Sequence, residues 1–155
     1  MKTTSAISFA ALFVLFICVT SIRTHPLLVD RFANFIVANG KTVSEEGSIM
    51  NAALSWGKWQ QGDEDVTTVN YIGFNTAKAA SFRASGRDGS PSGAEGTFDI
   101  YEGGRRIALV EFSIPFWGGN EVKIHEFDDQ FVCNQKGLTA KGSPTINIKC
   151  HRIPS

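Results

Sequence analysis

Three tryptophans stand in surroundings that are typical of turns rather than of strand interiors. Trp56 and Trp59 lie beside a glycine and a lysine, and Trp117 follows a Pro-Phe pair and precedes two glycines. An indole ring suits the boundary between water and an apolar phase, because its flat body is buried there while its N–H stays hydrated. Tryptophans also pack at the ends of a protein core. The sequence therefore leaves two roles open: contact with a lipid or another ligand, and end-of-core packing.

Lys58 lies between Trp56 and Trp59, where its ammonium group can reach a phosphate as a point charge. A role in solubility alone is an equal alternative. Two or three interfacial aromatic rings that each bury about 100 Å² would contribute roughly 2.5 kcal/mol apiece. That is enough for reversible adsorption to a membrane, whereas selectivity for one lipid would need hydrogen bonds to its head group.

The residue types that carry catalysis or bind metals form no motif. His25, His125 and His151 lack metal-ligand spacing, and no Ser or Cys lies in a nucleophile motif. His125 is expected on the polar face of a strand. The acidic run Asp63–Asp65 lacks the distal bidentate glutamate of a Ca²⁺ loop and is expected to be a solvated turn. We expect no enzymatic activity, no metal site and no cofactor.

Length and charge set further bounds on function. The chain has 155 residues, a length that is enough for one domain with a sizeable core. It has 15 basic and 15 acidic side chains. A formal net charge of zero removes the long-range attraction that a nucleic-acid-binding protein usually needs. We therefore expect no nucleic-acid partner.

The N-terminal segment is expected to be a secretory signal peptide over residues 1–21. Lys2 precedes the uncharged apolar run Ala6–Thr20, which is shorter than the roughly 20 residues of a membrane span. An uncleaved membrane anchor is the alternative. Cleavage near Ser21 would leave one domain over residues 22–155 in a secreted, extracellular protein.

Two cysteines remain after such a cleavage, Cys133 and Cys150, an even number in an oxidising route. If Lys141-Gly142 are the central residues of a hairpin turn, the two cysteines face each other at a non-hydrogen-bonded position. That position allows a disulfide. Gly137 is the weak point, because it can break the strand and lengthen the loop. We predict a Cys133–Cys150 disulfide away from the tryptophans, with two unrelated buried thiols as the alternative.

From residue 30 onward, short runs of β-branched and aromatic residues alternate with turn residues. The clearest hairpin runs from Phe98 to Leu109, where Gly103-Gly104 supply the positive φ angles of a two-residue turn. That turn pairs Ile100 with Ile107 and Phe98 with Leu109. The fold class is expected to be all-β, a single antiparallel β-sandwich. Its strands are expected at Phe32–Ala38, Ser48–Trp56, Val66–Phe74, Ala80–Ser85, Gly96–Glu102, Arg105–Ser113, Glu121–Phe127, Gln130–Cys133 and Thr145–Cys150.

Three segments carry a family resemblance. Leu54–Val66 resembles the aegerolysin segment in which a Ser-Trp-Gly-Lys turn precedes an acidic Gly-Asp loop. Gly86–Tyr101 is similar to that family's Gly-Arg-Ser-Asp…Gly-Thr-x-Gly-x-Phe-Asp-Leu stretch, and Val110–Gly118 to its Val-x-Trp-Asp-Cys-Pro-Trp-Gly. The order and spacing match over nearly the whole expected mature chain.

The resemblance implies an actinoporin-like β-sandwich that binds membranes containing sphingolipids, in some members together with a sterol. It also implies cytolytic activity, alone or with a larger partner protein of the membrane-attack-complex/perforin type. Trp56 and Trp117 match family tryptophans that meet the bilayer. Phe32 and Phe112 stand where the family usually has tryptophan. A secreted soluble binding module that keeps the scaffold without lipid recognition is the alternative function.

The chain also departs from the family pattern. Phe116 is inserted between Pro115 and Trp117, and Asn120 takes the place of a basic residue. The acidic residue with which some members sense lipid arrangement aligns with Ser92, and Glu95 follows three positions later. The expected membrane-binding site consists of Phe32, Trp56, Lys58, Trp59, Glu95, Phe112, Phe116 and Trp117.

Overall fold

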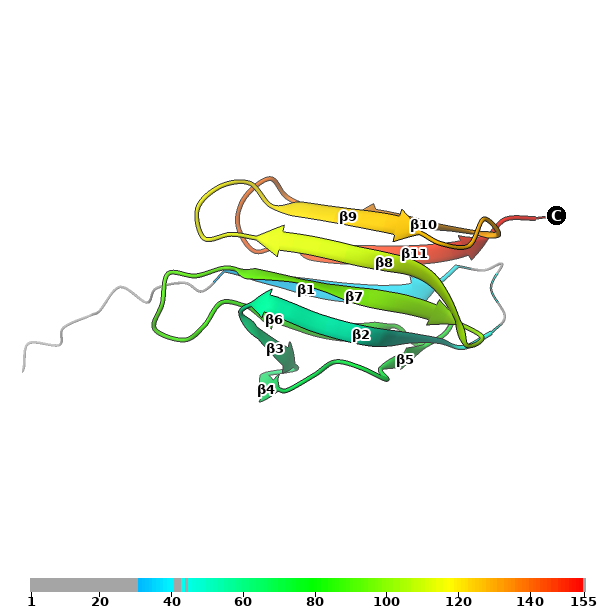
Figure 1. Ribbon diagram of the computed structural model, residues 1–155, viewed down its shortest axis with the longest axis horizontal. Helices are drawn as coiled ribbons and strands as arrows, with labels where there is room; N and C mark the ends of the chain where they lie inside the picture. The colour runs from blue at the N-terminus through cyan, green and yellow to red at the C-terminus, as the bar shows by residue number, and fades with distance from the viewer. Residues whose placement is uncertain (1–30, 41–42, 44, 155) are drawn as a thin grey trace, which may run out of the picture.

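The computed structural model describes residues 31–40, 43 and 45–154, which fold into two β-sheets packed face to face (Figure 1). The expected signal peptide, residues 1–21, lies outside the described residues. One sheet has the strand order β10-β11-β1-β6-β3-β4 and the other β5-β2-β7-β8-β9. The all-β sandwich expected from the sequence is confirmed. The strands are β1 (Phe32–Asn39), β2 (Gly47–Trp56), β3 (Lys58–Gln61), β4 (Glu64–Val66), β5 (Gly73–Phe74), β6 (Ala80–Ser85), β7 (Ala94–Glu102), β8 (Arg105–Ile114), β9 (Glu121–Glu126), β10 (Phe131–Lys136) and β11 (Thr145–Arg152).

One strand pair departs from the antiparallel arrangement. β1 and β11 run parallel, from Asn34 opposite Thr145 to Asn39 opposite Cys150. A parallel pair needs a long connection, and here β2 to β10 provide it. The first and last described strands therefore lie side by side in the middle of one sheet.

The core consists of the side chains that alternate inward from both sheets. In β1, Ala33, Phe35 and Val37 are fully buried while their neighbours are half-buried, as a period of two requires. The ring of Phe35 lies 5.4 Å from that of Phe82 in its own sheet and 5.2 Å from that of Phe98 in the other. Aromatic contacts thus join the two sheets.

The β7–β8 hairpin has the expected turn but not the expected register. Gly103 and Gly104 adopt φ angles of 53° and 77°, as a two-residue hairpin turn requires. A bulge follows at Ile107, so Ile100 pairs with Ala108 and every later pair is shifted by one residue. The expected partners of Ile100 and Phe98 are therefore wrong. The bulge lets the adjacent Ile107 and Ala108 both be fully buried, which strict alternation forbids.

The segment after β2 also differs from the expectation. Instead of one strand over Val66–Phe74, β3 and β4 form a short hairpin and β5 has two residues. The backbone leaves the extended conformation at Tyr71, whose φ is 67°. Just before it, the Asn70 side chain accepts a hydrogen bond from the Ala52 amide at 2.7 Å. Residues 67–72 therefore brace the edge of β2 rather than continuing a strand.

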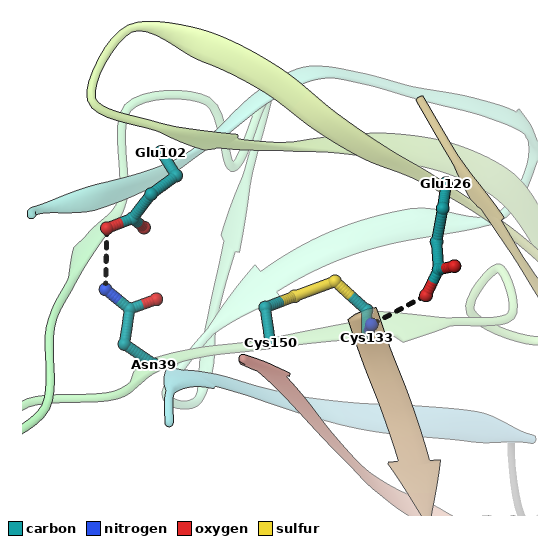
Figure 2. The surroundings of a disulfide bond; sticks show 5 residues. All are labelled: Asn39, Glu102, Glu126, Cys133 and Cys150. Atoms are coloured by element: carbon teal, nitrogen blue, oxygen red, sulfur yellow. Dashed lines mark hydrogen bonds between the residues drawn. A yellow bond between two sulfur atoms is a disulfide. The ribbon is translucent and has the colours of Figure 1, made fainter. Parts of the chain in front are cut away.

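The C-terminal hairpin confirms the predicted cysteine pair. Cys133 in β10 lies opposite Cys150 in β11, and a disulfide joins them (Figure 2). The turn is different from the expected one. Gly137 adopts a φ of 88° and the strands separate there, so residues 137–144 form a loop rather than a two-residue turn. The longer loop does not change the pairing of Cys133 with Cys150, because the ladder from Phe131 to Lys136 is uninterrupted.

Side chains close one open side of the sandwich, where β9 and β10 are the edge strands of their sheets. The Cys133 amide donates a hydrogen bond to Glu126 Oε1 at 2.7 Å (Figure 2). Further along, Gln135 Nε2 donates to the Val122 carbonyl at 3.3 Å. These bonds satisfy backbone groups that an edge strand would otherwise expose.

Candidate functional site

Four connections gather at the end of the sandwich where β2, β6 and β8 finish, drawn at the left in Figure 1. We call it the tryptophan end, because Trp56 closes β2 there and Trp117 lies in the β8–β9 loop. Gly57 turns the chain from β2 into β3 with a φ of 108°, and Pro115 ends the ladder of β8. Both tryptophans therefore stand at strand ends, 45% and 80% exposed.

The two tryptophans line one groove of about 430 Å³, here called the tryptophan groove. Its walls come from β2, the β6–β7 loop and the β8–β9 loop. The ring of Phe116 packs edge-on against that of Trp117, with the centroids 4.8 Å apart. The lining consists of Trp56, Ser90, Pro91, Ser92, Gly93, Ala94, Glu95, Ser113, Pro115, Phe116 and Trp117. Four of the expected membrane-contacting residues thus meet here: Trp56, Glu95, Phe116 and Trp117.

The β8–β9 loop that carries Trp117 is braced by the β10–β11 loop. Asn120 donates from its side-chain amide to the carbonyl groups of Thr139 and Gly142, at 3.0 and 3.1 Å. Its backbone amide donates to the Ala140 carbonyl at 3.0 Å. Asn120 therefore anchors the loop and leaves Trp117 exposed on a fixed support.

Two of the expected contact residues are core residues instead. Trp59 and Phe112 are each only 3% exposed, and their ring centroids lie 5.8 Å apart. Trp59 also packs edge-on against Phe82. The register of β3 turns Trp59 inward opposite Ala84, because side chains alternate between the two faces of a strand. The expectation that these two rings contact lipid is corrected: neither has surface to offer a bilayer.

Phe32 and Lys58 lie at the tryptophan end but outside the groove lining. Phe32, at the start of β1, is half-buried, and the Arg83 guanidinium lies 4.7 Å from its ring centroid. The Lys58 ammonium pairs with Asp88 at 2.7 Å and with Asp65 at 2.9 Å. These hydrogen bonds raise the pKa of Lys58 above its usual value. Lys58 is therefore held by two carboxylates.

An arginine that the sequence analysis did not assign lies on the Trp56 ring. The Arg87 guanidinium carbon is 4.2 Å from the ring centroid, within the range of a cation–π contact. The backbone amide of Arg87 donates a hydrogen bond to Ser92 Oγ at 2.9 Å, which helps to hold the β6–β7 loop. Ser92, which is 8% exposed, thus holds the loop in shape, whereas Glu95 is exposed in the groove. In the sequence, Arg87 belongs to the Gly86–Tyr101 segment that resembles the family, and nothing in its neighbours indicates the contact with Trp56.

Among the described residues, no group of three or more His, Cys, Asp or Glu side chains is placed to hold a metal ion. His125 is exposed on β9 and lies 3.1 Å from Glu111. Asp65 of the acidic run is bonded to Lys58 and Gln60. The part of the chain that the structure describes also has no helix of the length and apolar character that a membrane crossing demands.

Comparison with known proteins identifies a family and a relative of this chain. A model of the aegerolysin family matches residues 34–152. Asp-hemolysin of Aspergillus fumigatus is 39% identical over 90 residues, a stretch that covers 55% of this chain and 62% of Asp-hemolysin. The match therefore spans less than two thirds of that relative's length.

Solved structures share the fold. RahU, crystallised in complex with a TRIS molecule, has a TM-score of 0.73 at 21% identity, over 81% of this chain and 97% of RahU. IP-1A from Alcaligenes faecalis has a TM-score of 0.68 at 19% identity, over 80% and 92%. The lipid binding protein Nakanori has a TM-score of 0.54 at 9% identity, over 80% and 72%. At these identities the likeness concerns the fold alone.

Proposed function

Because the chain belongs to the aegerolysin family, we propose that it is a secreted protein that binds membranes through the tryptophan groove. Its lipid class is the sphingolipids, with or without a sterol. Lysis of the membrane follows either from this chain alone or together with a membrane-attack-complex/perforin-type partner protein. The haemolysin relative and the lipid-binding structural neighbour support the membrane part of this proposal.

The observation that carries the proposal is the exposure of Trp117. An indole that is 80% exposed on a braced loop is unusual in a soluble domain, where large aromatic rings are mostly covered. Trp56 and Phe116 lie in the same groove. Burying about 100 Å² of apolar surface on each ring contributes roughly 2.5 kcal/mol per ring. The sum supports reversible adsorption.

The test is sedimentation of the purified protein with vesicles across a panel of sphingolipid and sterol compositions. We expect Trp117→Ala and Trp56→Ala each to weaken binding to the preferred vesicle about tenfold or more, with cooperative melting retained. Phe127→Ala is the matched control, because Phe127 is also an exposed ring, 52%, and lies at the other end of the sandwich. It should bind like the parent.

Two results would reject this assignment. Absence of binding to every sphingolipid and sterol mixture would leave a secreted soluble binding module as the better description. An equal loss in the Phe127→Ala control would mean that exposed aromatic rings adsorb without a defined site. Haemolysis assays with and without a perforin-type protein then separate lysis by this chain alone from lysis with a partner.

A further inference from the structure

Two arginines lie on aromatic rings of the same groove. The Arg87 guanidinium carbon is 4.2 Å from the centroid of Trp56, and that of Arg31 is 5.9 Å from the centroid of Phe116. Both rings line the tryptophan groove. The two arginines are far apart in sequence, and a backbone hydrogen bond of 2.9 Å from the Gly86 amide to the Arg31 carbonyl joins their segments. The two arginines are not themselves part of the lining, and each adjoins the groove through the ring on which it lies.

Neither guanidinium has a carboxylate partner among the described residues. Arg105 and Arg106 pair with Asp128 and Asp99, at 3.1 and 2.6 Å. Arg31 and Arg87 form no such pair in the part of the chain that the structure describes. Two cations without a carboxylate partner in the described part of the chain therefore lie on rings of this groove.

Lys58 explains why Arg87 is left unpaired. Asp88, the next residue in the chain, is a ready partner for Arg87, but its carboxylate accepts from the Lys58 ammonium at 2.7 Å. Lys58 also holds Asp65. Lys58 therefore holds Asp88, the acidic neighbour of Arg87 in the chain, and its own ammonium is occupied by two carboxylates.

Arg31 has an unmet hydrogen-bonding requirement as well. Its Nη1 atom is buried and has no hydrogen-bond partner among the described residues, and it lies close to Gly142 in the β10–β11 loop. A buried guanidinium N–H without an acceptor is unfavourable, because it has lost its bonds to water and gained none in return. An anionic acceptor at this position would satisfy it. The same loop supports Asn120 and, through it, the Trp117 loop.

We propose that Arg31 and Arg87 form an anion site at the tryptophan groove that takes the phosphate of a lipid head group. A planar guanidinium matches the oxygen spacing of a phosphate and can donate two parallel hydrogen bonds to it. Stacking on an aromatic ring covers the guanidinium face and leaves its N–H edge free for these bonds. This inference rests on the proposed membrane binding and adds the chemical group that the groove recognises.

The experiment compares two vesicle types. Both contain digalactosyldiacylglycerol, which has no phosphate, as the bulk lipid. The first type also contains a phosphosphingolipid, and the second contains glucosylceramide in place of the phosphosphingolipid, so that it is free of phosphate. We expect Arg87→Gln and Arg31→Gln each to weaken binding to the phosphate-bearing vesicles about tenfold, as loss of a charge-assisted hydrogen-bonded contact predicts. Binding to the phosphate-free vesicles should change less than about twofold. Arg87→Lys should recover only part of the loss, because an ammonium lacks the planar fork.

Arg83→Gln is the matched control. Arg83 also lies over an aromatic ring, 4.7 Å from the centroid of Phe32, but that ring does not line the groove, and Arg83 donates to Asn34 Oδ1. The Arg83→Gln substitution removes the same charge and should leave binding to both vesicle types unchanged. An equal loss in Arg83→Gln, or an equal loss on both vesicle types in Arg87→Gln, overturns the anion site. If Arg31→Gln melts early, the exposed Arg87 variants alone decide.

A second measurement separates failure of this site from failure of the proposed function. Phosphoethanolamine and inorganic phosphate are titrated into the parent protein and Arg87→Gln, and chemical shifts of the Trp56 indole are followed by NMR. Shifts in the parent that Arg87→Gln abolishes support the anion site even if no vesicle is bound. If the parent binds vesicles but neither Arg87→Gln nor Arg31→Gln differs from it, the anion site is wrong while membrane binding stands. No response to phosphate and no vesicle binding reject both.

Discussion

An arginine stacks on an exposed aromatic ring at both ends of the sandwich, but in different electrostatic surroundings. At the tryptophan end, Arg87 lies 4.2 Å from the centroid of Trp56 and has no carboxylate partner among the described residues. At the other end, Arg106 lies 4.2 Å from the centroid of Phe127 and donates to Asp99 at 2.6 Å. The distance from guanidinium to ring is therefore the same at both ends. Among the described residues, a carboxylate neutralises the arginine only at the end opposite the tryptophans.

The two ends also differ in how the chain is held together. The Cys133–Cys150 disulfide lies at the end opposite the tryptophans, which we call the disulfide end, near the buried pair of Glu102 and Asn39 (Figure 2). The tryptophan end instead consists of loops braced by hydrogen bonds, with Trp117 exposed. One end is thus held by a covalent bond and a buried polar contact, and the other by hydrogen bonds between loops.

The largest expected effect separates the buried tryptophan from the exposed ones. Trp59→Ala removes a ring that is 3% exposed and packs on Phe82 and Phe112, so it should lower the free energy of unfolding by about 3–5 kcal/mol. Trp117→Ala should change it by less than about 0.5 kcal/mol, because its ring is mostly in water. Urea denaturation followed by circular dichroism measures both. Comparable losses in the two variants would contradict the assignment of Trp59 to the core.

Removal of the disulfide should have the next largest effect, confined to stability. The double variant Cys133→Ala/Cys150→Ala opens a loop of sequence separation 17 and should lose roughly 3 kcal/mol of unfolding free energy. Vesicle binding below the melting temperature should match that of the parent, because the cysteines lie far from the groove. Thermal melting and vesicle sedimentation of the same preparation test this. A selective loss of lipid affinity would show that the two ends are coupled.

The buried carboxyl group at the disulfide end predicts a pH dependence of stability. Burial raises the pKa of Glu102 to about 7, the Asn39 side-chain amide donates to Oε1 at 3.2 Å, and Oε2 has no hydrogen-bond partner among the described residues. The nearby Glu45 carboxylate also raises this pKa. The folded state thus holds a proton that the unfolded state releases near pH 4.5, so stability should fall as the pH rises from about 5 through 7. Over pH 5 to 8 the loss is roughly 2 kcal/mol.

Glu102→Gln tests this dependence, because it keeps the shape of the side chain and cannot ionise. The variant should match the parent at pH 5 and be more stable at pH 8, with no change in vesicle binding at either pH. Chemical denaturation at both pH values measures the difference. A parent protein that is equally stable at pH 5 and pH 8 would show that Glu102 does not titrate in this range.

The sequence predicted the fold well where alternation and turn chemistry agree. β6 begins and ends at the expected residues, and the register of Cys133 against Cys150 is confirmed. It failed where a side chain in another segment sets the local structure. The bulge at Ile107 depends on core space that both sheets enclose, and the end of the expected Val66–Phe74 strand depends on Asn70 bonding to β2.

The candidate site was predicted only in part, for a related reason. Glycine and proline neighbours correctly indicated strand ends for Trp56 and Trp117. They gave the same indication for Trp59, which the register of β3 turns into the core. The partners of charged groups are also set by three-dimensional proximity: Lys58 meets Asp88 across 30 residues of sequence. A sequence read locally cannot tell a neutralised cation from an available one.

The smallest expected effect tests the indirect role of Lys58. Lys58→Gln releases Asp88, whose carboxylate is then free to pair with the neighbouring Arg87, so vesicle binding should weaken by about two- to fivefold, the range of an exposed ion pair. The double variant Lys58→Gln/Asp88→Asn removes both charges and should restore binding to the parent level. A lysine that contacted phosphate itself would give no such rescue. Vesicle sedimentation of the parent, both single variants and the double variant measures this coupling, and a double variant as weak as Lys58→Gln would assign the phosphate contact to Lys58.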